Sequence, residues 1–214
     1  REWVWATQIR NENELFVIDM LVTPENNIHL AVGFTGDVEL NNTILEASTD
    51  QSLLIASFNE NGESLSHVKT DTIGGIEPTG SLCIDGLGAT YVAATFTGEL
   101  IFNETNLLSD GPSGIAVARY SEFGWDWALT AGGLGEDRVW DCDGRSSSGV
   151  EIVGEFSGNA SFASNIAQAI PDPSLTIGVV CLGRESPGIH NVVWGLFDYL
   201  QIADEGDGSS ATAG

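Results

Sequence analysis

Apolar side chains along this chain alternate with a period of two residues. In Thr90–Phe96 the odd- and even-numbered positions point to opposite faces of an extended segment, and both faces are largely apolar or neutral. Gly114–Tyr120 shows the same alternation, and such strands are usually covered on both sides. Turn residues separate these runs, and no segment carries the i, i+3, i+4, i+7 apolar stripe of an amphipathic helix. The pattern predicts an all-β fold.

Two landmarks recur along the chain with nearly the same period. A Phe-Thr-Gly or Phe-Ser-Gly phrase begins at Phe34, Phe96 and Phe156, in steps of almost equal length. A second apolar run recurs in equal steps, at Leu53, Ile115 and Ile177. Agreement between two landmarks indicates an internal repeat of about 61 residues, and long periods of this kind are typical of stacked or radially arranged units.

The repeat predicts three four-stranded antiparallel units. We expect the strands of the first unit at Trp3–Gln8, Leu15–Leu21, Ile28–Val38 and Ser52–Phe58. The units span about 3–66, 67–124 and 125–190, an extra strand follows at 191–202, and 203–214 is expected to be a flexible Gly/Ser/Ala tail. Residues 1–202 would therefore form a single repeat domain. Four antiparallel strands per unit match one propeller blade, whose faces are buried by neighbouring blades.

A resemblance to a known family rests on specific residues. "GWDWALTAGG" at Gly124–Gly133 combines with an Asp/Gly hairpin, a Tyr-Val-x-x-x-Phe-x-Gly strand and a closing "IAVARYSEFG" run. This arrangement resembles the bacterial and archaeal β-propeller repeat family, whose blades carry Trp-Ala…Gly-Gly, Asp-x-x-Gly-Asn and Tyr-Val-x-Gly-x-Phe-x-Gly. Ile84–Gly133 matches best, and near the C-terminus Trp194-Gly195 stands several residues away from the expected place of Trp-Ala. The resemblance implies propeller-like blades; a three-fold β-prism or trefoil-like closure is the alternative.

Three blades do not readily close a ring, since single-chain propellers typically have about four to eight. Strands at both ends would then be exposed edges, which invite pairing with another chain. We expect the protein to assemble with itself or with another protein subunit through its terminal strands. The residues expected to mediate assembly are Trp3, Trp5, Val192, Val193, Trp194 and Leu196. Where tryptophans alternate as Trp-x-Trp, both rings are expected on one face of a strand.

The charge balance narrows the possible partners. The chain has 31 Asp and Glu against seven Lys and Arg, which gives a formal net charge of −24. Such a surface repels nucleic-acid phosphates and anionic lipid heads, so we exclude nucleic-acid and membrane-surface binding. No apolar run is long enough to be inserted into a membrane. The carboxylate excess favours life in concentrated salt, where charge repulsion is screened, and the alternative is that the carboxylates hold divalent cations.

The cysteines and histidines give no sign of a metal or redox centre. Cys83, Cys142 and Cys181 are odd in number and form no CxxC pair, so we expect neither a disulfide framework nor a zinc site, and we expect small apolar core positions. The histidines are His29, His67 and His190. None belongs to an HxxxH or HExxH pattern, and we expect His67 to be a strand residue.

One acidic segment is a weak candidate for calcium. Asp141-x-Asp143-Gly144 begins like a calcium-binding loop, although Asp and Gly at this point also suit a plain hairpin turn. No cofactor other than Ca²⁺ is suggested. No serine lies in a G-x-S-x-G elbow, and a pair of carboxylates for glycoside hydrolysis cannot be chosen among 31 acids without geometry.

Three N-x-Ser/Thr sequons recur with the repeat. They begin at Asn41, Asn103 and Asn159, and each follows its Phe-x-Gly phrase. We expect each sequon to lie on an exposed turn, which makes the asparagines candidate glycan sites in a protein outside the cytoplasm; the alternative is that Asn and Thr are simply common turn residues.

These observations lead to one functional expectation and one rival. We expect a non-enzymatic structural or adhesive protein, extracellular at a cell surface or virion surface, in a high-salt organism or its virus. The rival is a carbohydrate-binding or carbohydrate-hydrolysing β-propeller with its site at the ring centre. A defined oligomer in molar salt favours the first, and a compact monomer with a central acidic pocket favours the second.

Overall fold

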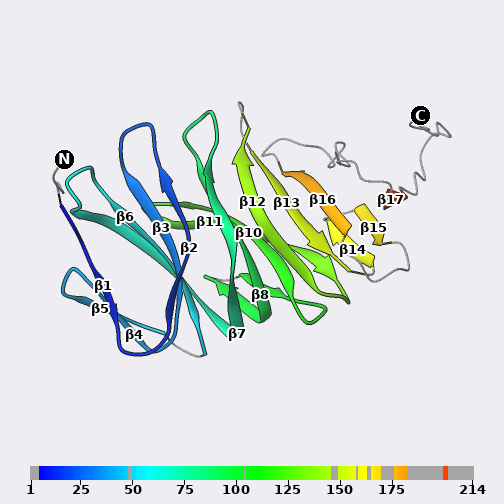
Figure 1. The fold of residues 1–214 in the computed structure, drawn as a ribbon, viewed down its shortest axis with the longest axis horizontal. Coiled ribbons are helices and arrows are strands. Elements are labelled where there is room, and N and C mark those ends of the chain that lie inside the picture. The colour runs from blue at the N-terminus through cyan, green and yellow to red at the C-terminus, as the bar shows by residue number, and fades with distance from the viewer. Residues whose placement is uncertain are drawn as a thin grey trace.

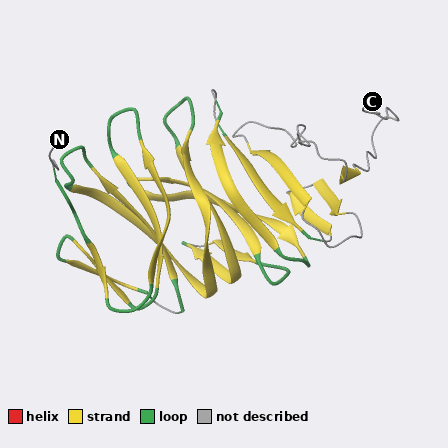
Figure 2. Cartoon of the chain, in the orientation of Figure 1, coloured by secondary structure: helices red, strands yellow, loops and turns green. Residues whose placement is uncertain are grey.

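The predicted fold class is confirmed at the level of secondary structure. The computed structural model describes residues 5–47, 50–103, 105–145, 149–157, 159–162, 165–169, 176–182 and 200–201. Throughout these residues the regular elements are β-strands, and all their pairings are antiparallel (Figures 1 and 2). The described strands form three sheets, and none of these closes on itself over the described residues. No helix in this part of the chain is long and apolar enough to cross a membrane.

The first part of the chain forms strands β1 to β6. Two predicted strands are confirmed, β2 (Leu15–Val22) and β6 (Ser52–Phe58). The predicted strand Ile28–Val38 is instead β3 (Ile28–Phe34) and β4 (Asp37–Leu40), because the chain turns at Gly36, whose φ of +67° suits glycine. β4 continues into a hairpin with β5 (Thr43–Glu46).

The predicted first strand, Trp3–Gln8, is wrong over its described part. Trp5–Gln8 lies outside any strand, and the short β1 (Ile9–Asn11) follows it and pairs with β4. A strand exists only where a neighbour offers a hydrogen-bonding ladder, and no described strand pairs with Trp5–Gln8.

A 21-residue strand, β7 (Ser64–Ile84), links this region to the middle of the molecule. Its first part pairs with β6 and its second part pairs with β8 (Thr90–Phe102), with a register shift between Ile76 and Gly80. β8 also pairs with β9 (Thr105–Leu108) and with β10 (Gly114–Ser121), which in turn pairs with β11 (Gly124–Gly133). These strands therefore belong to one continuous hydrogen-bonded sheet with β2, β3 and β6.

The last part of the chain supplies a separate sheet of β12 (Asp137–Gly144), β13 (Val150–Phe156) and β16 (Thr176–Leu182). Between β13 and β16 lies the hairpin of β14 (Asn159–Phe162) and β15 (Asn165–Ala169). β14 pairs with β11, and β15 pairs with the short β17 (Leu200–Gln201), so this hairpin extends the central sheet.

The same pairing register occurs at three places along the chain. The phenylalanine of each repeated phrase faces the first residue of the next long strand. These pairs are Phe34 with Ser52, Phe96 with Gly114 and Phe156 with Thr176. In each case the strand on the other side of the phenylalanine strand carries a register shift, in β2, β7 and β12 respectively. The spacing of residues in the sequence therefore reappears as equal hydrogen-bond registers.

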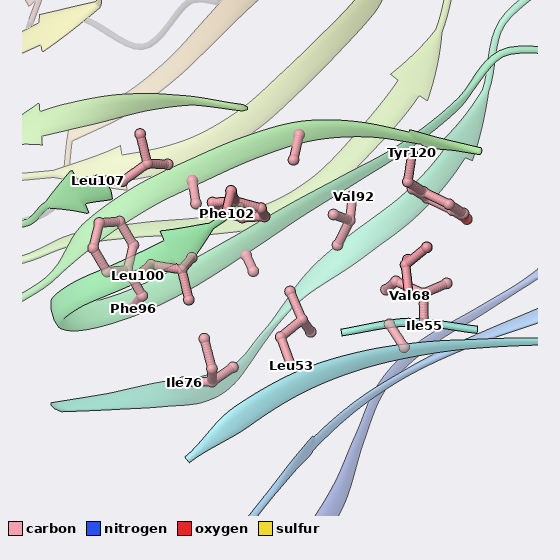
Figure 3. Packing of buried hydrophobic residues seen from close by; sticks show 14 of the residues in the cluster. Leu53, Ile55, Val68, Ile76, Val92, Phe96, Leu100, Phe102, Leu107 and Tyr120 are labelled. Atoms are coloured by element: carbon pink, nitrogen blue, oxygen red, sulfur yellow. The ribbon is translucent and has the colours of Figure 1, made fainter. Parts of the chain in front are cut away.

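Three apolar clusters form the core of the part of the chain that the structure describes. The largest lies between β3, β6 and one face of β8 and β10, and it includes Leu53, Ile55 and Phe96 (Figure 3). A second cluster lies between the other face of β8 and β10 and strands β12 and β13. A third covers the opposite face of β3 and β6, together with β4. Every residue of Thr90–Phe96 is buried, which confirms that this strand is covered on both sides.

Candidate functional site

Three polar side chains from separate strands meet at one point in the molecule. Asp19 of β2, Ser81 of β7 and Asp141 of β12 each lie just beyond the register shift of their strand, and they face Ala31, Ala93 and Val153 respectively. The Ser81 hydroxyl lies 3.0 Å from Asp19 Oδ2 and 2.9 Å from Asp141 Oδ1. Bulges commonly redirect a side chain, and here they bring three strands to a common polar junction.

Backbone amides hold both carboxylates of this junction in place. Asp19 accepts hydrogen bonds from the amides of Met20 and Leu82, each at 2.7 Å, and Asp141 accepts one from Cys142 at 2.9 Å. Ser81 is only 5% exposed and its hydroxyl has one proton, so it donates to one carboxylate at a time. The junction is therefore a link between strands, and the buried hydroxyl occupies the space between its two acids.

The calcium-loop interpretation of Asp141 and Asp143 is wrong as to local structure. Both residues lie within strand β12, where Asp143 pairs with Glu151 of β13 across an antiparallel ladder. No three His, Cys, Asp or Glu side chains converge in a metal-holding group in the described part of the chain. Binding of Ca²⁺ itself stays a prediction.

A disulfide bond joins Cys83 to Cys142, with the two Cα atoms 5.9 Å apart. The expectation that the cysteines form no disulfide is therefore wrong. Cys83 lies on β7 opposite Tyr91, and Cys142 lies on β12 opposite Ile152, so the bond fastens the sheet of β12 to β7. The odd number of cysteines argued against a disulfide, but two of the three cysteines are paired and Cys181 is the third.

Asp85 forms a second polar connection between the same two regions. Its carboxylate accepts hydrogen bonds from the Tyr91 hydroxyl at 2.7 Å and from the Gly149 amide at 3.0 Å. Burial alone would raise the pKa of Asp85, but these bonds and the amides of Ala89 and Leu87 lower that pKa below its usual value. The ionised carboxylate thus holds the β7–β8 turn against the start of β13.

Asp137, at the start of β12, has the opposite electrostatic character. It is fully buried, and burial raises the pKa of its carboxyl group to about 6, although amide hydrogen bonds from Gly133 and Ser157 offset part of this effect. The Gly133 amide donates to Asp137 Oδ2 at 2.7 Å, so this side chain fixes the turn between β11 and β12.

The two described histidines, His29 and His67, lie within strands. Nδ1 of His29 is 3.0 Å from the hydroxyl of Tyr120, and burial lowers the pKa of this histidine. His67 lies in β7, which confirms that it is a strand residue, and His190 lies outside the described residues.

The tryptophans differ in part from the prediction. Trp125 packs against the first core cluster, whereas Trp127 packs against the second, so their rings lie on opposite faces of β11. The register shift between Arg119 and Tyr120 of β10, the strand opposite, accompanies this change of face.

Of the predicted assembly residues, only Trp5 is described. Its indole N–H donates to the carbonyl of Glu60 at 2.7 Å, and its ring lies against Gly62. Trp3, Val192, Val193, Trp194 and Leu196 lie outside the described residues.

The three sequons do not share one location. Asn41 and Asn103 are exposed at the turns of the β4–β5 and β8–β9 hairpins, with φ values of +48° and +46°. Asn159 is also exposed but lies in strand β14, where it pairs with Gln168. The expectation that every sequon occupies a turn is therefore wrong for Asn159.

A cavity of about 240 Å³ lies between β10, β11 and β14. The described lining is mainly glycine and small side chains, and Asp110 is the one carboxylate among these residues. Hydrolysis of a glycoside commonly needs two carboxyl groups flanking the bond, and the described lining of this cavity does not provide them.

The curated proteins that the chain matches share short segments with it. No family model matches the chain. Thirty residues are 53% identical to the alpha 1 subunit of pyrophosphate–fructose 6-phosphate 1-phosphotransferase from Arabidopsis thaliana, covering 14% of this chain and 5% of that protein. Matches of 51% over 37 residues to the alpha subunit from Solanum tuberosum and 59% over 34 residues to the Arabidopsis thaliana beta 1 subunit cover 17% and 16% of this chain. The chain spans 5–6% of the length of these curated relatives, and no family follows from so short a match.

Proposed function

We propose that this chain is a non-enzymatic structural protein that acts outside the cell, built from three propeller-like blades that assemble with other copies through their end strands. The two ends of the stack carry this proposal. One end presents the segment Trp5–Gln8, with which no described strand pairs, and the other presents β16, which pairs on one side only among the described residues. Open backbone edges favour pairing with another chain.

The blade arrangement is supported by pairing and by packing. Strands β2, β3, β6 and the first part of β7 form one antiparallel run of four, and the second part of β7 with β8, β10 and β11 forms another. β12, β13 and β16 form the start of a third. Apolar clusters fill the spaces between successive runs, as expected for blades that bury one another's faces. Two copies would supply six blades, within the usual range of about four to eight.

An extracellular location is supported by the chemistry of the cysteines. The disulfide between Cys83 and Cys142 would persist in an oxidising environment and is uncommon in the cytosol. The exposed side chains of Asn41, Asn103 and Asn159 would be available to glycosylation there. The excess of acids over bases, 31 against seven, fits surroundings of high salt.

The carbohydrate-processing alternative has less support. Asp19 and Asp141 approach a common point, but the buried Ser81 hydroxyl lies between them. A sugar would have to displace this side chain, and the separate cavity offers one carboxylate in its described lining. We therefore assign Asp19 and Asp141 to holding the strands together.

Light scattering coupled to size exclusion in 2 M KCl tests the proposal. We expect a mass that is a whole multiple of 22.6 kDa and larger than one copy. A mass of one copy across a hundredfold range of concentration would refute assembly of this chain with itself.

A further inference from the structure

The segment Trp5–Asn11 lies where the last strand of a blade would lie, but none of the described strands forms the rest of that blade beside it. β1 pairs with β4 so that Ile9 faces Leu40, and β11 pairs with β14 so that Ala131 faces Phe162. Ala131 follows Ile9 in the sequence by the same number of residues as Phe162 follows Leu40, and this number equals two periods of the repeat. The segment that ends in β1 therefore has the same position relative to the β4–β5 hairpin as β11 has relative to the β14–β15 hairpin.

The sequence of this segment agrees with its position. Trp5-Ala6 precedes Trp127-Ala128 by two repeat periods, the same offset as the two ladders show. In β11, Trp127 pairs with Arg119 and Ala128 pairs with Ala118 of β10. Trp5–Gln8 has no such partner among the described strands. None of the described strands beside it is therefore equivalent to β10.

β16 is the strand with the matching open edge. Ile115 of β10 faces Thr95 of β8, and Ile177 of β16 faces Glu155 of β13, in the same register along the two sheets. β10 is covered on its other edge by β11, whereas β16 has no second partner in the described part of the chain. Among the described strands, the run of β12, β13 and β16 thus has no equivalent of β11, the strand that Trp5–Gln8 resembles.

Trp5–Gln8 and the open edge of β16 cannot pair with each other within one copy. β1 and β16 lie at opposite ends of the stack of strands (Figure 1). The chain's own C-terminal segment is a poorer match to the missing strand, because its Trp194-Gly195 lies several residues beyond the position that one further repeat period from Trp127 reaches. The fitting partner is therefore a second copy of this chain.

We propose that Trp5–Ile9 of one copy completes the third blade of a second copy by pairing antiparallel with Ile177–Cys181. The register of β11 on β10 places Thr7 opposite Val179 and Ala6 opposite Val180. This inference rests on the proposed self-assembly and adds to it the strands and the register through which copies join.

Mixtures of single-cysteine variants test the register between copies. All variants carry Cys181→Ser, so that only the native disulfide and one introduced thiol remain. Thr7→Cys mixed with Val179→Cys, and Ala6→Cys mixed with Val180→Cys, place residues directly opposite in an antiparallel pair, about 4.5–5.5 Å apart at Cα, a distance that a disulfide spans. The matched controls shift the register by one residue: Thr7→Cys with Val180→Cys, and Ala6→Cys with Val179→Cys.

After mild oxidation in 2 M KCl, we expect linked dimers in at least one in-register mixture and at least tenfold fewer in the out-of-register mixtures. Peptide mass spectrometry should map the link to positions 7 and 179 or 6 and 180. Each variant must first show the oligomer mass of the unaltered protein. If the oligomer persists but no in-register link forms, or if both registers link equally, the strand assignment is wrong and the proposed assembly survives. If the unaltered protein is a monomer, both proposals fail.

Discussion

Removing the disulfide between Cys83 and Cys142 should lower the free energy of unfolding by about 4 kcal/mol. The bond closes a loop with a sequence separation of 59 residues. For a loop of that length, loss of chain entropy in the unfolded state is worth about 4 kcal/mol at 25 °C in the chain-entropy model. Both residues are buried, at 4% and 8% exposure, so the folded geometry is already constrained by packing on every side.

The double variant Cys83→Ala, Cys142→Ala measures this effect, and Cys181→Ala is the matched control. Urea unfolding in 2 M KCl, followed by the fluorescence of the six tryptophans, gives the free energy of unfolding of each protein. We expect a loss of at least about 3 kcal/mol for the double variant, which also loses two buried sulfur atoms, and a change under about 1 kcal/mol for the control.

A thiol titration tests for the disulfide without a measurement of stability. The unaltered protein, unfolded without reductant, should expose one reactive thiol per chain, and the reduced protein should expose three. Three thiols without reductant, or a double variant as stable as the parent, would show that this bond does not hold the two sheets together.

Four further outcomes follow from the polar groups. Burial raises the pKa of Asp137 to about 6, so the folded protein binds this proton more tightly than the unfolded chain; its free energy of unfolding should fall by about 2 kcal/mol between pH 4 and 6, and Asp137→Asn should abolish that slope in urea titrations. The lowered pKa of Asp85 acts in the opposite sense, because the ionised carboxylate stabilises the fold above about pH 4 and this stabilisation is lost in acid. Asp85→Asn should therefore reduce the fall in the free energy of unfolding at acid pH. Ser81→Ala removes the hydroxyl shared by Asp19 and Asp141 and should cost about 1 kcal/mol, and a neutral result would leave the junction without a stabilising role. Raising KCl from 0.1 M to 2 M should raise Tm in calorimetry, because it screens a net charge of −24, and an unchanged Tm would remove the high-salt interpretation.

The sequence anticipated the local features of this fold. Alternation in Thr90–Phe96 predicted a strand covered on both sides, because the side-chain period of a strand is a property of its own backbone. The nearly equal steps between Phe34, Phe96 and Phe156 became equal hydrogen-bond registers, because similar segments select similar partners. The approximate positions of β2 and β6 were also predictable from their apolar runs.

The candidate site could not be found in the same way. Asp19, Ser81 and Asp141 follow one another at about one repeat period, so the repeat spacing contained a signal. The residue type is not constant, however, since a serine stands between two aspartates, and the bulges that turn the side chains towards one another have no single sequence signature. The same difficulty applies to Trp125 and Trp127, whose rings a register shift sends to opposite faces.

Strand content, strand spacing and the acidic surface could thus be predicted from the chain alone, since they depend on short-range patterns and on composition. The pairing of Cys83 with Cys142 could be known only from the folded molecule. The same holds for Trp5–Gln8, which lies outside any strand although it begins with the same Trp-Ala pair as the strand segment Trp127–Thr130. One cause accounts for both. A disulfide and a β-ladder each require a second segment at a fixed distance, and that distance is set by how sheets stack, which no single stretch of sequence contains.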